Sequence, residues 1–184
     1  MNRTNEQAIL SLAAALMRGA ITPTDFFVQL TQTIAALVGC SRTSVWRYTN
    51  ANRDAIVCEH LFDTRDNSHQ AGGILERDQF SPYFSAIRAN VVLMATHARF
   101  HPATECFNDA YFLPNDIHSL LDVNIDAHGK PWGLFCCEHT GEVKEWTDAD
   151  AAMLRSIGTM CGMALGRIRD AGSRTAAPTS SARP

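Results

Sequence analysis

The segment GKPWGLFCCEH, residues 129–139, carries most of the information about the fold. It joins an apolar run to the adjacent Cys136 and Cys137, which are followed directly by Glu138 and His139. The preceding segment, HSLLDVNIDA at 118–127, also has a strand-like composition. The two strand-like stretches, 118–127 and 130–139, are separated only by residues 128–129, His-Gly, which suits a two-residue turn. The sequence therefore predicts a β-hairpin.

Alternation of side chains along the two strands predicts which residues share a face. If Ala127 pairs with Lys130, residue 125 pairs with 132 and residue 123 with 134. One face is then apolar, is expected to pack against helices, and consists of Leu121, Val123, Ile125, Trp132, Leu134 and Cys136. The opposite face carries the more polar set Asp122, Asn124, Gly133, Phe135, Cys137 and His139. The two cysteines therefore point in opposite directions, and Cys136 is predicted to lie in the core.

A carboxylate in the middle of an apolar strand needs a reason to be there. Asp122 either pairs with Arg47, Lys130 or a backbone donor, or contacts a ligand, and the residues leave both open. His139 has the same two interpretations, as a satisfied histidine at a strand end or as a ligand contact.

The rest of the chain divides into helical and extended patterns. An apolar stripe predicts an N-terminal helix within residues 1–21, and TPTD at 22–25 predicts the start of a second helix that ends near Gly39. Residues 43–50 and 54–63 predict a hairpin in which Trp46 shares a face with Ser44, while Cys58, His60 and Phe62 share another. A long helix capped by Thr147 closes a folded unit over 22–170, and residues 171–184 are predicted to be disordered.

Composition narrows the class of protein. The 184 residues fit one domain, and a net charge of -3 gives no reason to expect nucleic acid as a partner. The six cysteines show no zinc spacing. The apolar run at 8–17 is too short for a membrane span and lacks the flanks of a signal peptide. We therefore expect a cytoplasmic protein with free thiols and no membrane contact.

The order of the elements resembles that of a GAF domain from about Thr22 to Arg169. The most specific pieces are SVWRY (44–48), SLLDVNI (119–125) and GKPWGLFCCEHT with WTDADAAML (129–154). The resemblance implies an α+β fold, in which an antiparallel sheet carries helices on one face and a small-molecule pocket on the other. The segment at 129–139 is also similar to a strand of phytochrome chromophore-binding domains. In those relatives the positions that match Asp122 and Asn124 line the pocket.

The resemblance and the polarity of the strands together suggest a set of ligand-binding residues. Tyr83 and Tyr111 lie in segments expected to roof the site. The full set is Trp46, Cys58, His60, Tyr83, Tyr111, Asp122, Asn124, Phe135, Cys137 and His139. The DIP motif and the Cys-His pair that mark covalent bilin binding are absent, as is the signature of cyclic-nucleotide binding. The sequence therefore leaves the cofactor or ligand unidentified.

Three functions remain in view. The first is a sensory module that binds a small molecule and passes a signal to a downstream protein or through a homodimer. The second is a GAF-type free methionine sulfoxide reductase, although Cys106 is the only cysteine in a predicted loop. The third is a dimerisation module with an empty pocket. Gly158, Gly162 and Gly166 recur along one face of the last helix, so they contact either its own sheet or a second subunit. We expect the second, with the terminal helices forming the dimer.

Overall fold

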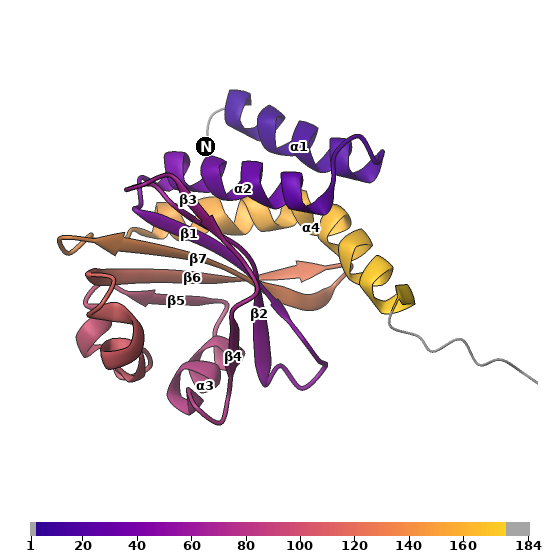
Figure 1. The fold of residues 1–184 in the computed structure, drawn as a ribbon. Helices are drawn as coiled ribbons and strands as arrows, with labels where there is room; N and C mark the ends of the chain where they lie inside the picture. Colours follow the sequence, from indigo (N-terminus) through magenta and orange to yellow (C-terminus); the bar gives the residue numbers. More distant parts are fainter. Residues whose placement is uncertain (1–2, 176–184) are drawn as a thin grey trace, which may run out of the picture.

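An antiparallel sheet of seven strands forms the centre of the structure, a computed structural model that describes residues 3–175 (Figure 1). The strands follow the order β3-β2-β1-β7-β6-β5, and β4 also pairs with β2. Their bounds are β1 Arg42–Tyr48, β2 Ala55–Asp63, β3 Ser68–Gln70, β4 Ile74–Glu76, β5 Val92–Ala95, β6 Ile117–Ala127 and β7 Lys130–Thr140. The α-helices are α1 Arg3–Met17, α2 Pro23–Val38, α3 Ser81–Ala89 and α4 Asp148–Thr175. Three short helices, η1 Ala98–Phe100, η2 Glu105–Phe107 and η3 Asn108–Phe112, lie between β5 and β6.

Helices α2 and α4 form a layer over one face of the sheet and α1 packs on the outer side of this helix layer, while α3 and the short helices lie on the other side of the sheet (Figure 1). The predicted α+β architecture is therefore confirmed. A separate apolar core lies on each side, one beneath the helix layer and one between the sheet and the α3 side. None of the helices within residues 3–175 is both long and apolar enough to cross a membrane.

Helix α2 begins and ends where its sequence predicts. The Thr22 hydroxyl accepts a hydrogen bond from the Asp25 amide, and the Asp25 carboxylate accepts one from the Thr22 amide, which forms a capping box. Pro23 occupies the first turn, where its missing N–H costs nothing. Gly39 ends the helix with a φ of 66°, a left-handed conformation that glycine adopts without strain.

Helix α4 is longer than predicted. It continues through Thr175, five residues into the segment 171–184 that is predicted to be disordered. A single glycine at 172 weakens a helix without ending it, so the composition of this segment is a poor guide to where α4 stops. The remainder of the predicted tail, residues 176–184, lies outside the described residues.

The glycine row of α4 packs against the protein's own sheet. A methyl group on Gly158 would lie 2.4 Å from the Ile125 side chain, and one on Gly166 would lie 2.2 Å from the His128 ring. A methyl group on Gly162 would lie 3.0 Å from the carbonyl oxygen of Asp126. The expectation that this row contacts a second subunit is therefore wrong, because β6 and the turn after it already occupy the space.

A β-bulge in the β6–β7 hairpin changes the predicted faces. Ala127 pairs with Lys130 as predicted, but Ile125 pairs with Gly133 rather than with Trp132, and Trp132 is left without an opposite residue. One extra residue on one strand moves every later side chain to the other face. Leu134 and Cys136 therefore lie on the α3 side, while Phe135 and Cys137 lie in the core beneath the helix layer. The predicted faces of these four residues are wrong.

A second bulge has the same effect on the β1–β2 hairpin. Val45 pairs with His60 and Trp46 pairs with Cys58, so Glu59 is the extra residue. Cys58 therefore shares the face of Trp46, while His60 points toward α2, and the prediction that Cys58 and His60 share a face is wrong. The prediction for Trp46 and Ser44 is confirmed, because the Trp46 indole N–H donates to the Ser44 hydroxyl at 2.8 Å.

Candidate ligand-binding site

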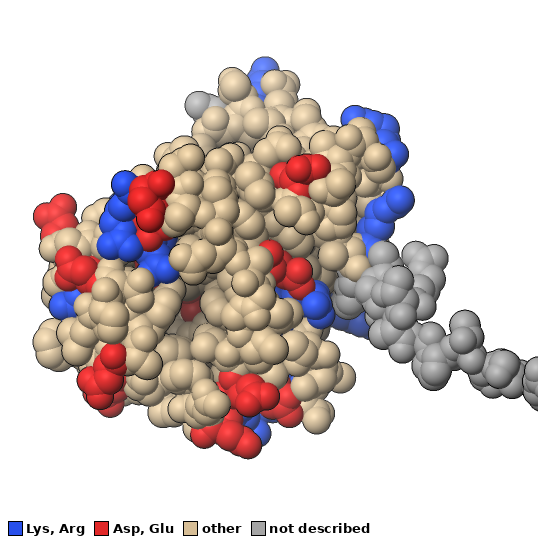
Figure 2. All heavy atoms as spheres, in the orientation of Figure 1, with Lys and Arg blue, Asp and Glu red and all other residues tan. Residues whose placement is uncertain are grey.

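A cavity of about 220 Å³ lies between the sheet and the segments that cross its α3 side. Strands β1, β6 and β7 form its floor, and residues 75–83 and 107–112 form its walls. The surface is hollowed between these segments, and acidic atoms are visible inside the hollow (Figure 2). The lining is mostly aromatic and apolar, and it consists of Trp46, Leu75, Phe80, Tyr83, Phe107, Ala110, Tyr111, Phe112, Leu120, Cys136 and Glu138.

Three of the predicted site residues line this cavity. Trp46 projects from β1, Tyr83 from the first turn of α3, and Tyr111 from the short helix η3. The Tyr83 hydroxyl donates to the Asp122 carboxyl at 2.6 Å, and the Tyr111 hydroxyl donates to Glu138 at 3.0 Å. Each aromatic side chain is thus held by a polar partner and presents its ring to the cavity.

Asp122 lies beneath the cavity, next to two of its lining residues. It is opposite Cys136 in the β6–β7 ladder and bonded to Tyr83, and neither Arg47 nor Lys130 is its partner. Its carboxyl is buried, and its Oδ1 atom has no hydrogen-bond partner. Burial raises the pKa of Asp122 to about 7, although the neighbouring Cys136 thiol and the hydrogen bond from Tyr83 oppose the shift.

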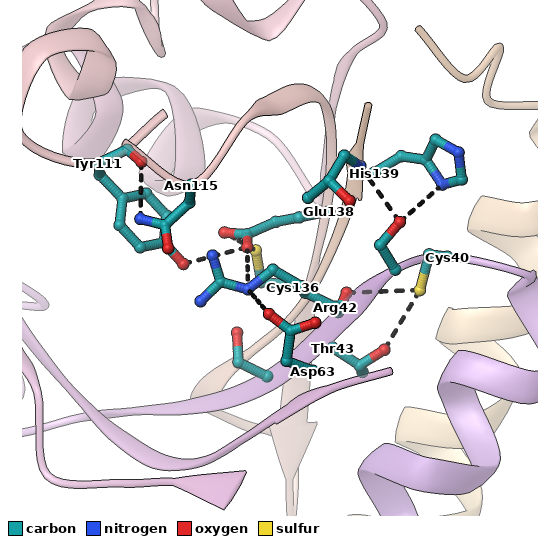
Figure 3. Close-up of polar contacts among 12 residues, drawn as sticks. Cys40, Arg42, Thr43, Asp63, Tyr111, Asn115, Cys136, Glu138 and His139 are labelled. Carbon is teal, nitrogen blue, oxygen red and sulfur yellow. Dashed lines mark hydrogen bonds and ion pairs between the residues drawn. The ribbon is translucent and has the colours of Figure 1, made fainter. Parts of the chain in front are cut away.

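Glu138 is the one acidic side chain among the residues that line the cavity. Figure 3 shows it beside Tyr111, Cys136 and Arg42. Its carboxyl accepts hydrogen bonds from Tyr111 and, at 3.8 Å, from the Cys136 thiol. The Arg42 Nε atom lies 3.6 Å from Glu138 and 3.2 Å from Asp63. Burial raises the pKa of Glu138, and the Arg42 charge opposes that shift.

Sequence reasoning missed this buried network of Arg42, Asp63 and Glu138. The sequence did contain a signal for this network. Glu138 directly follows the two cysteines, and Arg42 begins β1 opposite Asp63, which ends the adjacent strand β2. Strict alternation counted from the turn, however, predicted that Cys136 faces the helices. Glu138 lies two residues further along the same strand, so the same alternation puts it on the same face. Only the bulge at Trp132 brings both residues to the cavity.

The other predicted residues of β6 and β7 lie away from the cavity. Phe135 and Cys137 are fully buried in the core beneath the helix layer. His139 is half-buried at the end of β7, and its Nδ1 atom lies 3.4 Å from the Ser41 hydroxyl (Figure 3). Asn124 donates to backbone carbonyls at both Ile87 and Asn90, so it joins β6 to the end of α3.

The predicted residues of β2 are also outside the lining. Burial raises the pKa of the Cys58 thiol to about 12, which leaves it without nucleophilic character at neutral pH. His60 lies on the helix side, with Nδ1 2.9 Å from the Thr31 hydroxyl and Nε2 3.2 Å from His69. Burial and the nearby His69 lower the pKa of His60 to about 4, so it is neutral at pH 7. No group of three potential metal-ligating side chains occurs within residues 3–175.

Comparison with known proteins identifies the architecture. The GAF domain family model matches residues 22–165. A phycocyanobilin-bound GAF domain from a cyanobacterial phytochrome is similar at a TM-score of 0.70 and 14% identity, over 96% of this chain and 99% of that chain. The GAF domain of Thermosynechococcus elongatus PixJ, in its blue-light absorbing form, is similar at a TM-score of 0.66 and 15% identity, over 92% of this chain and 98% of that chain. The GAF domain of an Acinetobacter phosphoenolpyruvate-protein phosphotransferase is similar at a TM-score of 0.67 and 9% identity, over 94% of this chain and 99% of that chain.

No curated protein matches the chain. The structural likenesses, at 9–15% identity, show a shared fold, whereas the family model spans most of the folded part of the chain. The chain belongs to the GAF domain family.

Proposed function

We propose that this protein is a sensory or regulatory GAF domain that binds a small molecule in the cavity beneath α3 and η3. The observation that carries the proposal is the composition of the cavity wall, where aromatic and apolar side chains surround a buried carboxylate. Small-molecule sites have this combination of a concave apolar surface and few polar anchors.

The proposed ligand is smaller than a bilin and is not covalently bound. Sites for drug-sized ligands usually measure about 300–1,000 Å³, and the cavity of about 220 Å³ is below that range. The one thiol that lines it, Cys136, is engaged with Glu138, and burial raises its pKa well above the ordinary value. The described residues therefore do not fit a covalently attached linear tetrapyrrole, in agreement with the missing DIP motif.

The reductase alternative receives no support from the thiols near the cavity. A sulfoxide reductase needs a thiolate nucleophile and a second thiol to resolve the intermediate. Burial raises the pKa values of Cys58, Cys106 and Cys136, which disfavours the thiolate at each position. We therefore favour ligand binding without turnover.

We further propose that the signal passes through a dimer formed by the outer surfaces of α1 and α4. Helices α1 and α4 pack against each other, and each presents a large apolar side chain to solvent, Leu10 at 49% and Met163 at 64% exposure. Light scattering on the Leu10→Glu, Met163→Glu double variant should show loss of the dimer. Leu113→Glu, at a residue 53% exposed next to η3, is the matched control and should leave the dimer intact. A monomeric wild-type chain would contradict this part of the proposal.

Native mass spectrometry of the full chain purified from its own host tests ligand binding directly. We expect an additional mass that disappears when the protein is denatured. Ala110→Trp places an indole at the cavity wall and should abolish the retained mass, whereas Ala51→Trp at an exposed turn should not. Retention of the mass in Ala110→Trp would show that the molecule binds elsewhere.

A further inference from the structure

Every polar hydrogen on the side chains that line the cavity already has an acceptor inside the protein. The Trp46 indole donates to Ser44, and the Tyr83 hydroxyl donates to Asp122. The Tyr111 hydroxyl and the Cys136 thiol both donate to Glu138. These lining side chains therefore offer a ligand no free donor, and what remains on them is acceptor capacity.

The remaining acceptors are concentrated at the end of the cavity formed by Glu138 and Tyr111. The phenol oxygens of Tyr83 and Tyr111 each keep lone pairs after donating their hydrogens. An ionised carboxylate has about four acceptor positions, and Glu138 receives hydrogen bonds from only Tyr111 and Cys136 among the described residues. Below the floor, the Oδ1 atom of Asp122 also has no donor.

The buried arginine does not reverse this polarity. Arg42 is absent from the cavity lining, and its guanidinium carbon lies 5.3 Å from the centroid of the Tyr111 ring, which does line the cavity. Its Nε atom is closer to Asp63, at 3.2 Å, than to Glu138, at 3.6 Å, and Asp63 is itself paired with Arg65. Two arginines thus face two carboxylates in this network, and the Nε and Nη1 atoms of Arg42 make no hydrogen bond within the described part of the chain. Glu138 keeps acceptor positions for another donor, because it accepts hydrogen bonds only from Tyr111 and Cys136 among the described residues.

The segments that supply the walls of the cavity carry more acidic than basic side chains. Residues 74–80 and 105–113 carry the exposed acidic side chains Glu76, Asp78, Glu105 and Asp109, and the one basic residue in these segments is Arg77. An excess of one charge around a concave site attracts ligands of the opposite charge and repels those of the same charge. Aromatic rings in the wall also favour a cation at short range.

We propose that the cavity selects a small apolar molecule that carries a cationic nitrogen, such as a primary amine, with the nitrogen at Glu138 and Tyr111 and the apolar part against Trp46, Phe80 and Phe107. This inference rests on the proposed function, because it assigns a chemical class to the ligand of the same cavity. It predicts a preference for ammonium over hydroxyl and for hydroxyl over carboxylate at one end of an otherwise identical molecule.

Three probes with the same phenyl ring test the preference by calorimetry on the full chain at neutral pH. They are phenethylamine, 2-phenylethanol and phenylacetate, which differ at the polar end. We expect phenethylamine to bind at least tenfold more tightly than 2-phenylethanol, and phenylacetate to show no binding at the same concentrations. Glu138→Gln should reduce the affinity for phenethylamine about tenfold or more and change that for 2-phenylethanol less than threefold.

Tyr111→Phe is the second variant, because Glu138→Gln alters a buried ion-pair network and can affect folding. It removes one acceptor while keeping the ring, so it should also reduce the preference for the amine. Wild-type protein that binds phenylacetate or 2-phenylethanol as tightly as phenethylamine would overturn the ligand class and leave the proposed function standing. An amine preference that survives in both folded variants would overturn the assigned position. If no probe binds but native mass spectrometry finds a retained mass that Ala110→Trp abolishes, the ligand class alone is overturned. If no probe binds and no mass is retained, the proposed function is overturned as well.

Discussion

Gly158 of α4 lies so close to Ile125 of β6 that a methyl group on the glycine would be 2.4 Å from the isoleucine Cγ2 atom. Ile125 is buried and cannot move without disturbing the core beneath the helix layer. We expect Gly158→Ala to lower the free energy of unfolding by about 1–3 kcal/mol, the usual cost of overpacking, despite the higher helix propensity of alanine. Chemical denaturation measures the change.

Gly166→Ala is the matched control for this packing argument. The methyl group would meet the ring of His128, but His128 is exposed and its ring can turn into solvent. The variant should therefore be neutral or more stable by up to about 1 kcal/mol, because alanine favours a helix. Equal destabilisation by both substitutions would show that contact with Ile125 is not the reason for glycine at 158.

Strand β1 contains two arginine ion pairs that differ in burial. Arg42 pairs with Asp63 and Glu138, where all three side chains are at most 7% exposed, whereas Arg47 and Glu59 are 31% and 22% exposed. Arg42→Met should cost about 3–5 kcal/mol of stability, since it leaves the buried Glu138 without its cation, whereas Asp63 keeps Arg65. Arg47→Met should cost about 0–1 kcal/mol. Comparable losses in urea denaturation of the two variants would contradict the role assigned to burial.

The buried carboxyl of Asp122 should give the protein a distinctive dependence of stability on pH. Its folded-state pKa of about 7 is above the ordinary value of 3.8, so the folded state binds more protons than the unfolded state between these two values. The stabilisation is complete below about pH 4 and is lost as the pH rises through about 7.

Asp122→Asn removes the titration and preserves the shape of the side chain. The difference in unfolding free energy, wild type minus variant, should fall by roughly 2–4 kcal/mol between pH 4 and pH 8. Urea denaturation of both proteins across this range measures it, and the subtraction cancels the other titrating groups. A difference that is constant with pH would mean that Asp122 is ionised throughout in the folded protein.

The adjacent cysteines should respond differently to the same substitution. Cys137 is fully buried in the core beneath the helix layer, where Cys137→Ser should cost about 1–3 kcal/mol. Cys136 lies beside the cavity and donates to Glu138, a bond that a serine hydroxyl can replace. Cys136→Ser should therefore cost at least 1 kcal/mol less than Cys137→Ser, and a reversed order of thermal stability would mean that the two faces are misassigned.

Local sequence signals predicted the helices of the fold better than the faces of its strands. Thr22, Pro23, Asp25 and Gly39 fix the ends of α2 through contacts within the helix and its caps, which are visible in the sequence. The continuation of α4 through residues 171–175 could not be predicted in this way, because its small and polar residues there are typical of a disordered segment.

The faces of the strands were wrong because alternation assumes that no residue is inserted into the ladder. Trp132 and Glu59 are such insertions. Trp132 is flanked by Pro131 and Gly133, residue types that occur at bulges, whereas the neighbours of Glu59 carry no such signal. Trp132 is retained by its distant partner, since its indole N–H donates to the Leu165 carbonyl of α4 at 2.9 Å. Trp132 and Leu165 are 33 positions apart, so the alternation of side chains along one strand cannot predict their contact. Tyr83 and Tyr111 were predicted at the cavity from the segments that carry them, and Trp46 from the polarity of its strand and the family resemblance.

Because Cys136 and Cys137 point to opposite sides of the sheet, the single strand β7 borders both the cavity and the core beneath the helix layer. Glu138 and Cys136 face the cavity, and Phe135, their neighbour on the other side of the strand, lies 3.7 Å from where a methyl group on Gly158 would be. The ligand space and the long helix α4 therefore share a wall whose two surfaces are alternate residues of the same backbone. If the proposed ligand displaces β7, the displacement would act on α4 directly through the side chains of this one strand.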